Sequence, residues 1–133
     1  MTIHVIDTNI VLRLLMAGEP RQFEYAKRVM DEVRAGKLKA FLAESVLAGC
    51  IFVLTKFYKV PKEEAAAKLG ELLDYKGFTG DHVPVLKDAL AIFAANKIAL
   101  VDAIVLAHAR RNRWHLETFD KRLSNLAATQ GSA

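Results

Sequence analysis

Three aspartates stand where carboxylates from distant parts of the chain can meet. Asp7 ends the apolar, β-branched run at residues 3–6, Asp102 opens an apolar helix, and Asp120 follows a predicted strand at residues 114–119. Ligands bind at the carboxyl ends of the strands in an open parallel sheet, so we expect these carboxylates at one edge. Close carboxylates repel unless a cation joins them, and Mg²⁺ or Mn²⁺ takes oxygen ligands. The pattern predicts a metal site that activates water and stabilises charge on a phosphate.

Helix capping is the alternative explanation for each aspartate. Asp7 or Thr8 could cap a helix that begins near Asn9, and on Asp7 alone the two interpretations weigh about equally. Asp102 in the first turn of a helix is explained by capping in the same way. Three acids directed at one edge of a sheet favour the metal site.

Other chemistries lack their sequence patterns. The chain contains no Walker-type phosphate loop, no GxGxxG and no HExxH zinc spacing. His108 lies on an apolar helix, so we expect it to be a core histidine with satisfied hydrogen bonds rather than a catalytic residue. Cys50 is the only cysteine and lies in an apolar helical run, which indicates a buried structural thiol rather than a nucleophile.

Strands alternate with helices along the chain, which predicts an α/β fold, a three-layer α/β/α sandwich with a mainly parallel sheet. We expect a single domain over residues 1–130 and a frayed tail at residues 131–133. The expected strands are 3–6, 39–42 and 114–119, with a turn or very short strand at 77–80, and the expected helices begin near Asn9 and span 21–37, 44–58, 62–75, 83–96, 100–113 and 121–128.

The composition is that of a soluble globular domain. Hydrophobic residues make up 53% of the 133 residues and charged residues 26%. The net charge of +4 is weak evidence for a polyanionic partner. Asp7 and Arg13 interrupt the first apolar stretch, so no signal peptide is expected, and no apolar run reaches the length of a membrane span. The expected location is cytoplasmic.

Three segments together resemble the PIN-domain ribonucleases, and most closely the VapC toxins of toxin–antitoxin pairs. These segments are VIDTNI at residues 5–10, VDAIVLA at 101–107 and ETFDKRL at 117–123. The resemblance implies a PIN-like fold in which the three aspartates bind metal. It further implies that Asn9 and Thr118 support the metal ligands or position the substrate. The implied activity is that of an endoribonuclease toxin, which uses Mg²⁺ or Mn²⁺ to hydrolyse RNA phosphodiester bonds. The implied partners are a second copy of the chain and a VapB-like antitoxin.

Gly49 departs from the family pattern. The family places a glutamate in its third helix, in a pattern like V-L-A-E, whereas residues 46–49 read V-L-A-G. Glycine inside a helix costs about 0.5–1 kcal/mol relative to alanine, and nothing local requires a turn there. The alternative is that close helix packing demands a glycine. Our hypothesis is that Gly49 replaces an expected acid and impairs activity; Glu44 lies about 140° out of phase and is a poor substitute.

Basic residues follow the second and third acids. Arg110, Arg111 and Arg113 lie about a helix length from Asp102, or ~15 Å, so they are poor candidates for contacts at the metal. Lys121 and Arg122 adjoin Asp120 and are the better candidates for RNA phosphates. A solvated charged face is the default interpretation of such a run.

Two other functions stay open. The first is an inactive PIN-like binding module that titrates an antitoxin or RNA, which Gly49 favours. The second is a receiver- or phosphatase-like α/β domain in which Asp7 accepts a phosphoryl group, although position 9 is Asn rather than a second acid.

Overall fold

Helices make up most of the structure, which is a computed structural model that describes residues 2–131. In chain order the elements are β1 (Ile3–Val5), α1 (Thr8–Met16), α2 (Pro20–Ala35), β2 (Lys39–Phe41), α3 (Glu44–Phe52), η1 (Val53–Phe57), α4 (Lys62–Leu73), α5 (Val83–Ala95), α6 (Leu100–Asn112) and α7 (Lys121–Gly131). The π-helical turn η1 continues α3 directly, so the single helix predicted over residues 44–58 is confirmed as one helical stretch.

The sheet is small and parallel. β1 and β2 pair in the register Ile3 with Lys39 and Val5 with Phe41, and an isolated parallel bridge joins Ala40 to Phe78. Gly77 makes that bridge possible, because a Cβ there would lie 2.1 Å from the carbonyl oxygen of Leu38. The α/β class with a parallel sheet is therefore confirmed, although β1 and β2 are the only paired strands among residues 2–131.

The strand predicted at residues 114–119 is wrong. Residues 114–118 belong to no helix or strand, residue 119 is a bend, and Trp114 is 65% exposed. Arg113 adopts a left-handed conformation (φ 57°) that ends α6, and the Trp114 amide donates to the carbonyl of Ala109. The chain thus leaves α6 away from the sheet, and β propensity without a neighbouring strand does not make a strand. At the C-terminus α7 includes Gly131, and residues 132–133 of the predicted tail lie outside the described residues.

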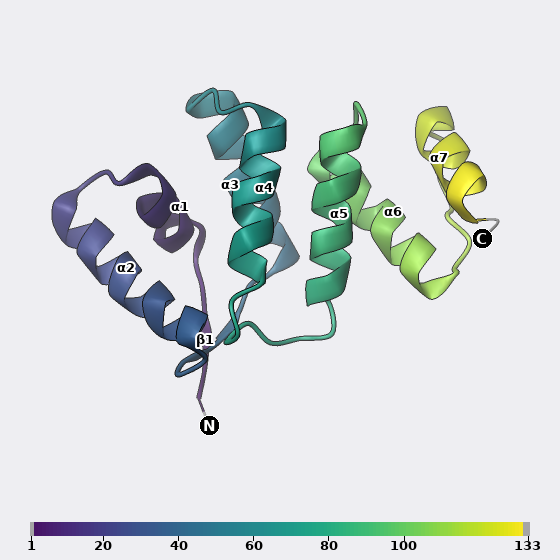
Figure 1. Ribbon diagram of the computed structural model, residues 1–133. Coiled ribbons are helices and arrows are strands. Elements are labelled where there is room, and N and C mark those ends of the chain that lie inside the picture. Colours follow the sequence, from purple (N-terminus) through teal and green to yellow (C-terminus); the bar gives the residue numbers. More distant parts are fainter. Residues whose placement is uncertain (1, 132–133) are drawn as a thin grey trace.

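The helices form a row in which α1 and α2 lie at one end and α7 at the other, with α4, α5 and α6 between them (Figure 1). Large side chains such as Met30, Leu47, Leu69, Leu86 and Leu106 are fully buried along this row. Among residues 2–131, β1 has a strand partner on one side only, which is β2, and its side chains Ile3 and Val5 are 53% and 71% exposed. The sheet consequently has an open edge next to Asp7.

Candidate active site

Asp7 lies at the carboxyl end of β1 and at the N-cap position of α1. Its backbone is extended (φ −84°, ψ 159°), yet its side chain makes no capping hydrogen bond. The carboxylate has no hydrogen bond or ion pair to any residue that the structure describes, and the residue is exposed. Capping therefore does not account for Asp7, and its oxygens are free to bind a ligand.

Gly49 faces the turn that follows Asp7. A Cβ added at Gly49 would lie 3.4 Å from Oγ1 and 3.8 Å from Cγ2 of Thr8, which is ordinary van der Waals contact. Close packing therefore does not require a glycine at this position. Thr8, the neighbour that an added Cβ would meet, follows Asp7 directly in the sequence.

Cys50 is buried beside the same turn. Burial, and secondarily the negative charge of Asp7, raises the pKa of the Cys50 thiol to about 12. The thiol stays protonated at physiological pH and is a poor nucleophile. The prediction of a buried, structural cysteine is confirmed.

Asp102 and Asp120 lie on other elements. Asp102 is half-buried in the first turn of α6. Asp120 is exposed and caps α7, because its Oδ1 accepts a hydrogen bond of 3.1 Å from the Leu123 amide. The hydroxyl of Thr118 accepts a hydrogen bond from the Asp120 amide, so Thr118 shapes this turn. Figure 1 places α7, which begins directly after Asp120, at the opposite end of the row from α1, which begins directly after Asp7.

The described residues 2–131 do not bring a set of metal ligands together. No group of three or more His, Cys, Asp or Glu side chains that could hold a metal ion occurs among the described residues. The predicted convergence of Asp7, Asp102 and Asp120 is thus not seen within the chain. Their roles, and that of Asn9 in the first turn of α1, stay predictions.

Glu44 and His108 form a pair that sequence reasoning missed. Nε2 of His108 lies 2.6 Å from Oε2 of Glu44, and both side chains are little more than one-third exposed. The pair joins the first turn of α3 to α6. His108 is therefore half-buried rather than a core residue, and the Glu44 carboxylate is already bound. Only the fold reveals this pair, since 64 residues separate its members.

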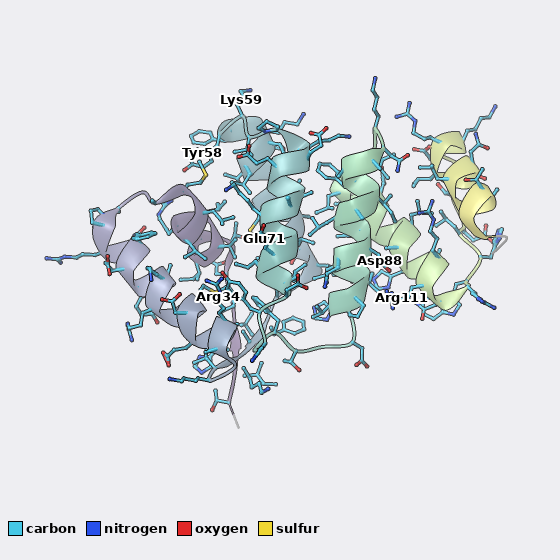
Figure 2. All side chains as sticks on the ribbon, viewed as in Figure 1. Arg34, Tyr58, Lys59, Glu71, Asp88 and Arg111 are labelled. Atoms are coloured by element: carbon cyan, nitrogen blue, oxygen red, sulfur yellow. The ribbon has the colours of Figure 1, made fainter. Side chains whose placement is uncertain are left out.

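Most of the arginines near the C-terminus hold the fold together. Arg111 forms an ion pair of 2.8 Å with Asp88 on α5, and Figure 2 shows the two side chains together. Arg110 donates to the carbonyl of Leu126 in α7, and burial lowers the pKa of its guanidinium. Arg122 donates to the carbonyl of Lys97. Lys121 is exposed and stays a candidate for an RNA contact.

A groove of about 510 Å³ lies between α3, η1, α5 and the start of α6. Apolar side chains that include Phe52 line it, with three lysines, and no carboxylate contributes to the lining. The lysines are Lys56, Lys62 and Lys97. Val101 also lines the groove, which places its end beside Asp102. Sequence reasoning missed these lysines because three separate segments bring them together.

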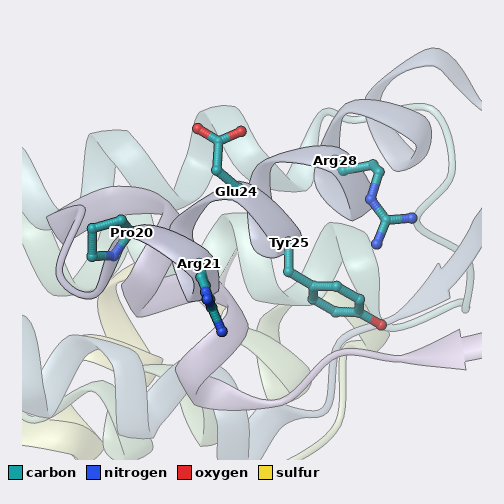
Figure 3. Close-up of a pocket in the computed structure, with 5 residues that line it drawn as sticks. All are labelled: Pro20, Arg21, Glu24, Tyr25 and Arg28. Atoms are coloured by element: carbon teal, nitrogen blue, oxygen red, sulfur yellow. The ribbon is translucent and has the colours of Figure 1, made fainter.

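A second, shallower hollow of about 520 Å³ lies along the start of α2. Figure 3 shows its lining, in which the Arg28 guanidinium carbon lies 5.0 Å from the centre of the Tyr25 ring. None of the three predicted aspartates lines this hollow. It is a basic and aromatic surface rather than a candidate catalytic centre.

The comparison with family models identifies the class of protein. The PIN domain model matches residues 4–129, nearly the whole chain, so the chain belongs to the PIN-domain family. PIN domains are generally nucleases that use divalent metals. The comparisons with curated proteins and with solved structures found no match. Within residues 2–131, no helix has the length and hydropathy of a membrane span.

Proposed function

We propose that this chain derives from a divalent-metal-dependent endoribonuclease of the VapC toxin type and that Gly49 impairs its activity. The observation that carries the proposal is that Asp7, at the end of β1, makes no capping hydrogen bond, and that Gly49 has room for a Cβ against Thr8, the residue after Asp7. Membership of the PIN-domain family supports hydrolysis of a nucleic acid. A VapB-like antitoxin is the proposed protein partner.

Asp7 is the residue around which the proposed site is built. A divalent metal would supply the activated water and the stabilisation of phosphate charge. Asp7 would provide one set of oxygens for that ion, and Asn9, in the first turn of α1, would position the substrate. Among residues 2–131 no further acids gather beside Asp7 in this conformation, so Asp7 by itself is only part of a metal site.

The lysine-lined groove supports an RNA substrate. Its three lysines attract a phosphate backbone, and exposed Phe52 offers a surface on which a base can stack. Lys62 is partly engaged, since its ammonium donates to the carbonyl of Asn96. Lys56 and Lys97 are the freer candidates for phosphate contacts.

The test is RNA cleavage with Mg²⁺ and with Mn²⁺ by this chain and by its Gly49→Glu variant. We expect weak or no cleavage by this chain and clear cleavage by the variant. Equal cleavage by both chains would sink the impairment hypothesis.

Gly49 also favours a second function, a binding module that holds RNA or an antitoxin without cutting. Tight RNA binding by both chains, with no cleavage by Gly49→Glu in either metal, is the result expected of that module.

A further inference from the structure

The groove between α3, η1, α5 and the start of α6 has the size and lining of a small-molecule site. Its volume of about 510 Å³ lies within the range of about 300–1,000 Å³ that such sites occupy, and its walls are mostly apolar with a few charged groups. Phe52 and Val101 both line the groove and are 63% and 58% exposed. A ligand that covers these two side chains removes apolar surface from water.

The charged groups of the groove are all cations. Within residues 2–131, Lys56, Lys62 and Lys97 line it and no carboxylate does. Lys56 and Lys97 take part in no ion pair of the described chain, and Lys62 gives one of its three N–H groups to the carbonyl of Asn96. Figure 1 shows why these segments meet: the chain passes from α3 to α4 and from α5 to α6 at the same, upper end of the helices. The groove therefore attracts a ligand with several negative charges.

An aromatic ring stands beside these cations. Phe52 ends α3, and Lys56 lies in η1, which continues that helix. The second ring of the groove, Phe93, is 8% exposed, and Nζ of Lys62 lies 5.5 Å from its centre, so Phe52 is the ring on which a ligand can stack. A nucleotide joins a flat base to phosphates and so matches both the ring and the lysines. A fatty acid would cover the same apolar walls but brings a single charge to three lysines.

We propose that this groove binds a free nucleoside triphosphate, with the base on Phe52 and the phosphates at Lys56 and Lys97. A nucleotide within an RNA strand offers one phosphate charge, whereas a triphosphate offers several to the same lysines. Because the groove is also the proposed path of the RNA, the bound triphosphate competes with RNA for it. Only this competition rests on the proposed function, since binding of the triphosphate can be measured without RNA.

The test is isothermal titration calorimetry of the full chain with ATP in EDTA, so that no divalent ion takes part. Adenosine and tripolyphosphate are titrated as the two halves of the ligand. We expect ATP to bind at least about tenfold more tightly than either half, and Phe52→Ala to weaken ATP binding by about tenfold. The matched control is Phe57→Ala, because Phe57 is 73% exposed and lies outside the groove lining. We expect this control to leave ATP binding unchanged.

A second pair of variants tests the lysines. Lys56→Gln/Lys97→Gln should weaken ATP binding by about tenfold or more. Lys37→Gln/Lys59→Gln removes the same charge from exposed positions outside the lining and should leave ATP binding unchanged. Equal losses in the two double variants would show that ATP responds to net charge alone, and the proposal would fail.

Other results would also overturn the proposal. One is tripolyphosphate that binds as tightly as ATP, and another is a Phe52→Ala loss no larger than that of Phe57→Ala. A third is single-stranded RNA that binds through Lys56 and Lys97 but is not displaced by ATP; the groove would then hold RNA alone, and the proposed function would stand. ATP binding in the groove without RNA cleavage by Gly49→Glu would count against the proposed function alone.

Discussion

Replacing Gly49 separates the two explanations for a glycine in α3. If the glycine replaces a larger residue, Gly49→Ala removes the helix penalty and raises the free energy of unfolding by about 0.5–1 kcal/mol. The unfolding entropy of a chain of this length is about 0.28 kcal/mol/K, so the melting temperature rises by about 2–4 °C. The contact of 3.4 Å between the added Cβ and Thr8 leaves that gain intact.

Gly49→Glu gains the same helix propensity but adds a carboxylate near Asp7. Two carboxylates about 4 Å apart in bulk water repel by about 1 kcal/mol, and by less at larger separations, which offsets much of the gain. Without metal we therefore expect a melting temperature close to that of the parent chain. With free Mn²⁺ at about ten times its dissociation constant, stabilisation of about 1.4 kcal/mol raises the melting temperature of Gly49→Glu by about 5 °C.

The assay is differential scanning calorimetry of the parent, Gly49→Ala and Gly49→Glu chains, each with EDTA and with Mn²⁺. A Gly49→Ala chain less stable than the parent would show that packing demands the glycine, and the replacement hypothesis would fail. A metal response of equal size in all three chains would show that residue 49 does not face the metal.

Three further predictions concern single groups. Because the folded chain raises the pKa of the Cys50 thiol from 9.0 to about 12, the free energy of unfolding should be unaffected by this group below about pH 9 and should fall as the pH rises from 9 toward 12. At pH 8 a thiol reagent should label Cys50 only after unfolding, and rapid labelling of the native chain would contradict its burial. A double-mutant cycle of Glu44→Gln and His108→Gln should give a coupling of about 0.5–1 kcal/mol in urea unfolding, and additivity would show that the pair contributes nothing. Lys97→Gln should reduce the slope of log K against log salt for binding of single-stranded RNA by about 0.7. If Lys121→Gln reduces this slope and Lys97→Gln does not, the RNA binds along α7 rather than in the groove.

Sequence periodicity predicts the helices of this protein because each apolar stripe is a local property. The stripes at residues 21–37 and 62–75 become α2 and α4, and Gly36 ends α2 in a left-handed conformation as its position suggested. The stretch at residues 114–119 shows the limit of this reasoning. Its composition is typical of a strand, but a strand forms only beside a neighbouring strand. After Arg113 ends α6, the segment pairs with no strand in the described part of the molecule.

In the candidate site, too, some features follow from local sequence and others depend on how distant segments pack. The apolar run before Asp7 predicted its place at the end of a strand, and its side chain makes no capping hydrogen bond; its role at a metal stays a prediction. An added Cβ at Gly49 would contact Thr8, but an acid at that position stays a prediction from the resemblance. The Glu44–His108 pair and the lysines of the groove depend on how distant segments pack, which no local pattern encodes.

Single-turnover cleavage of an end-labelled RNA in Mn²⁺ tests the central claim most directly, comparing Gly49→Glu with the neutral, equally large Gly49→Gln. We predict that the glutamate chain cleaves at least about tenfold faster than the glutamine chain, and that adding Asp7→Asn to the glutamate chain abolishes the difference. Equal rates for the glutamate and glutamine chains, or cleavage that survives Asp7→Asn, would contradict a nuclease site centred on Asp7 and completed by an acid at position 49.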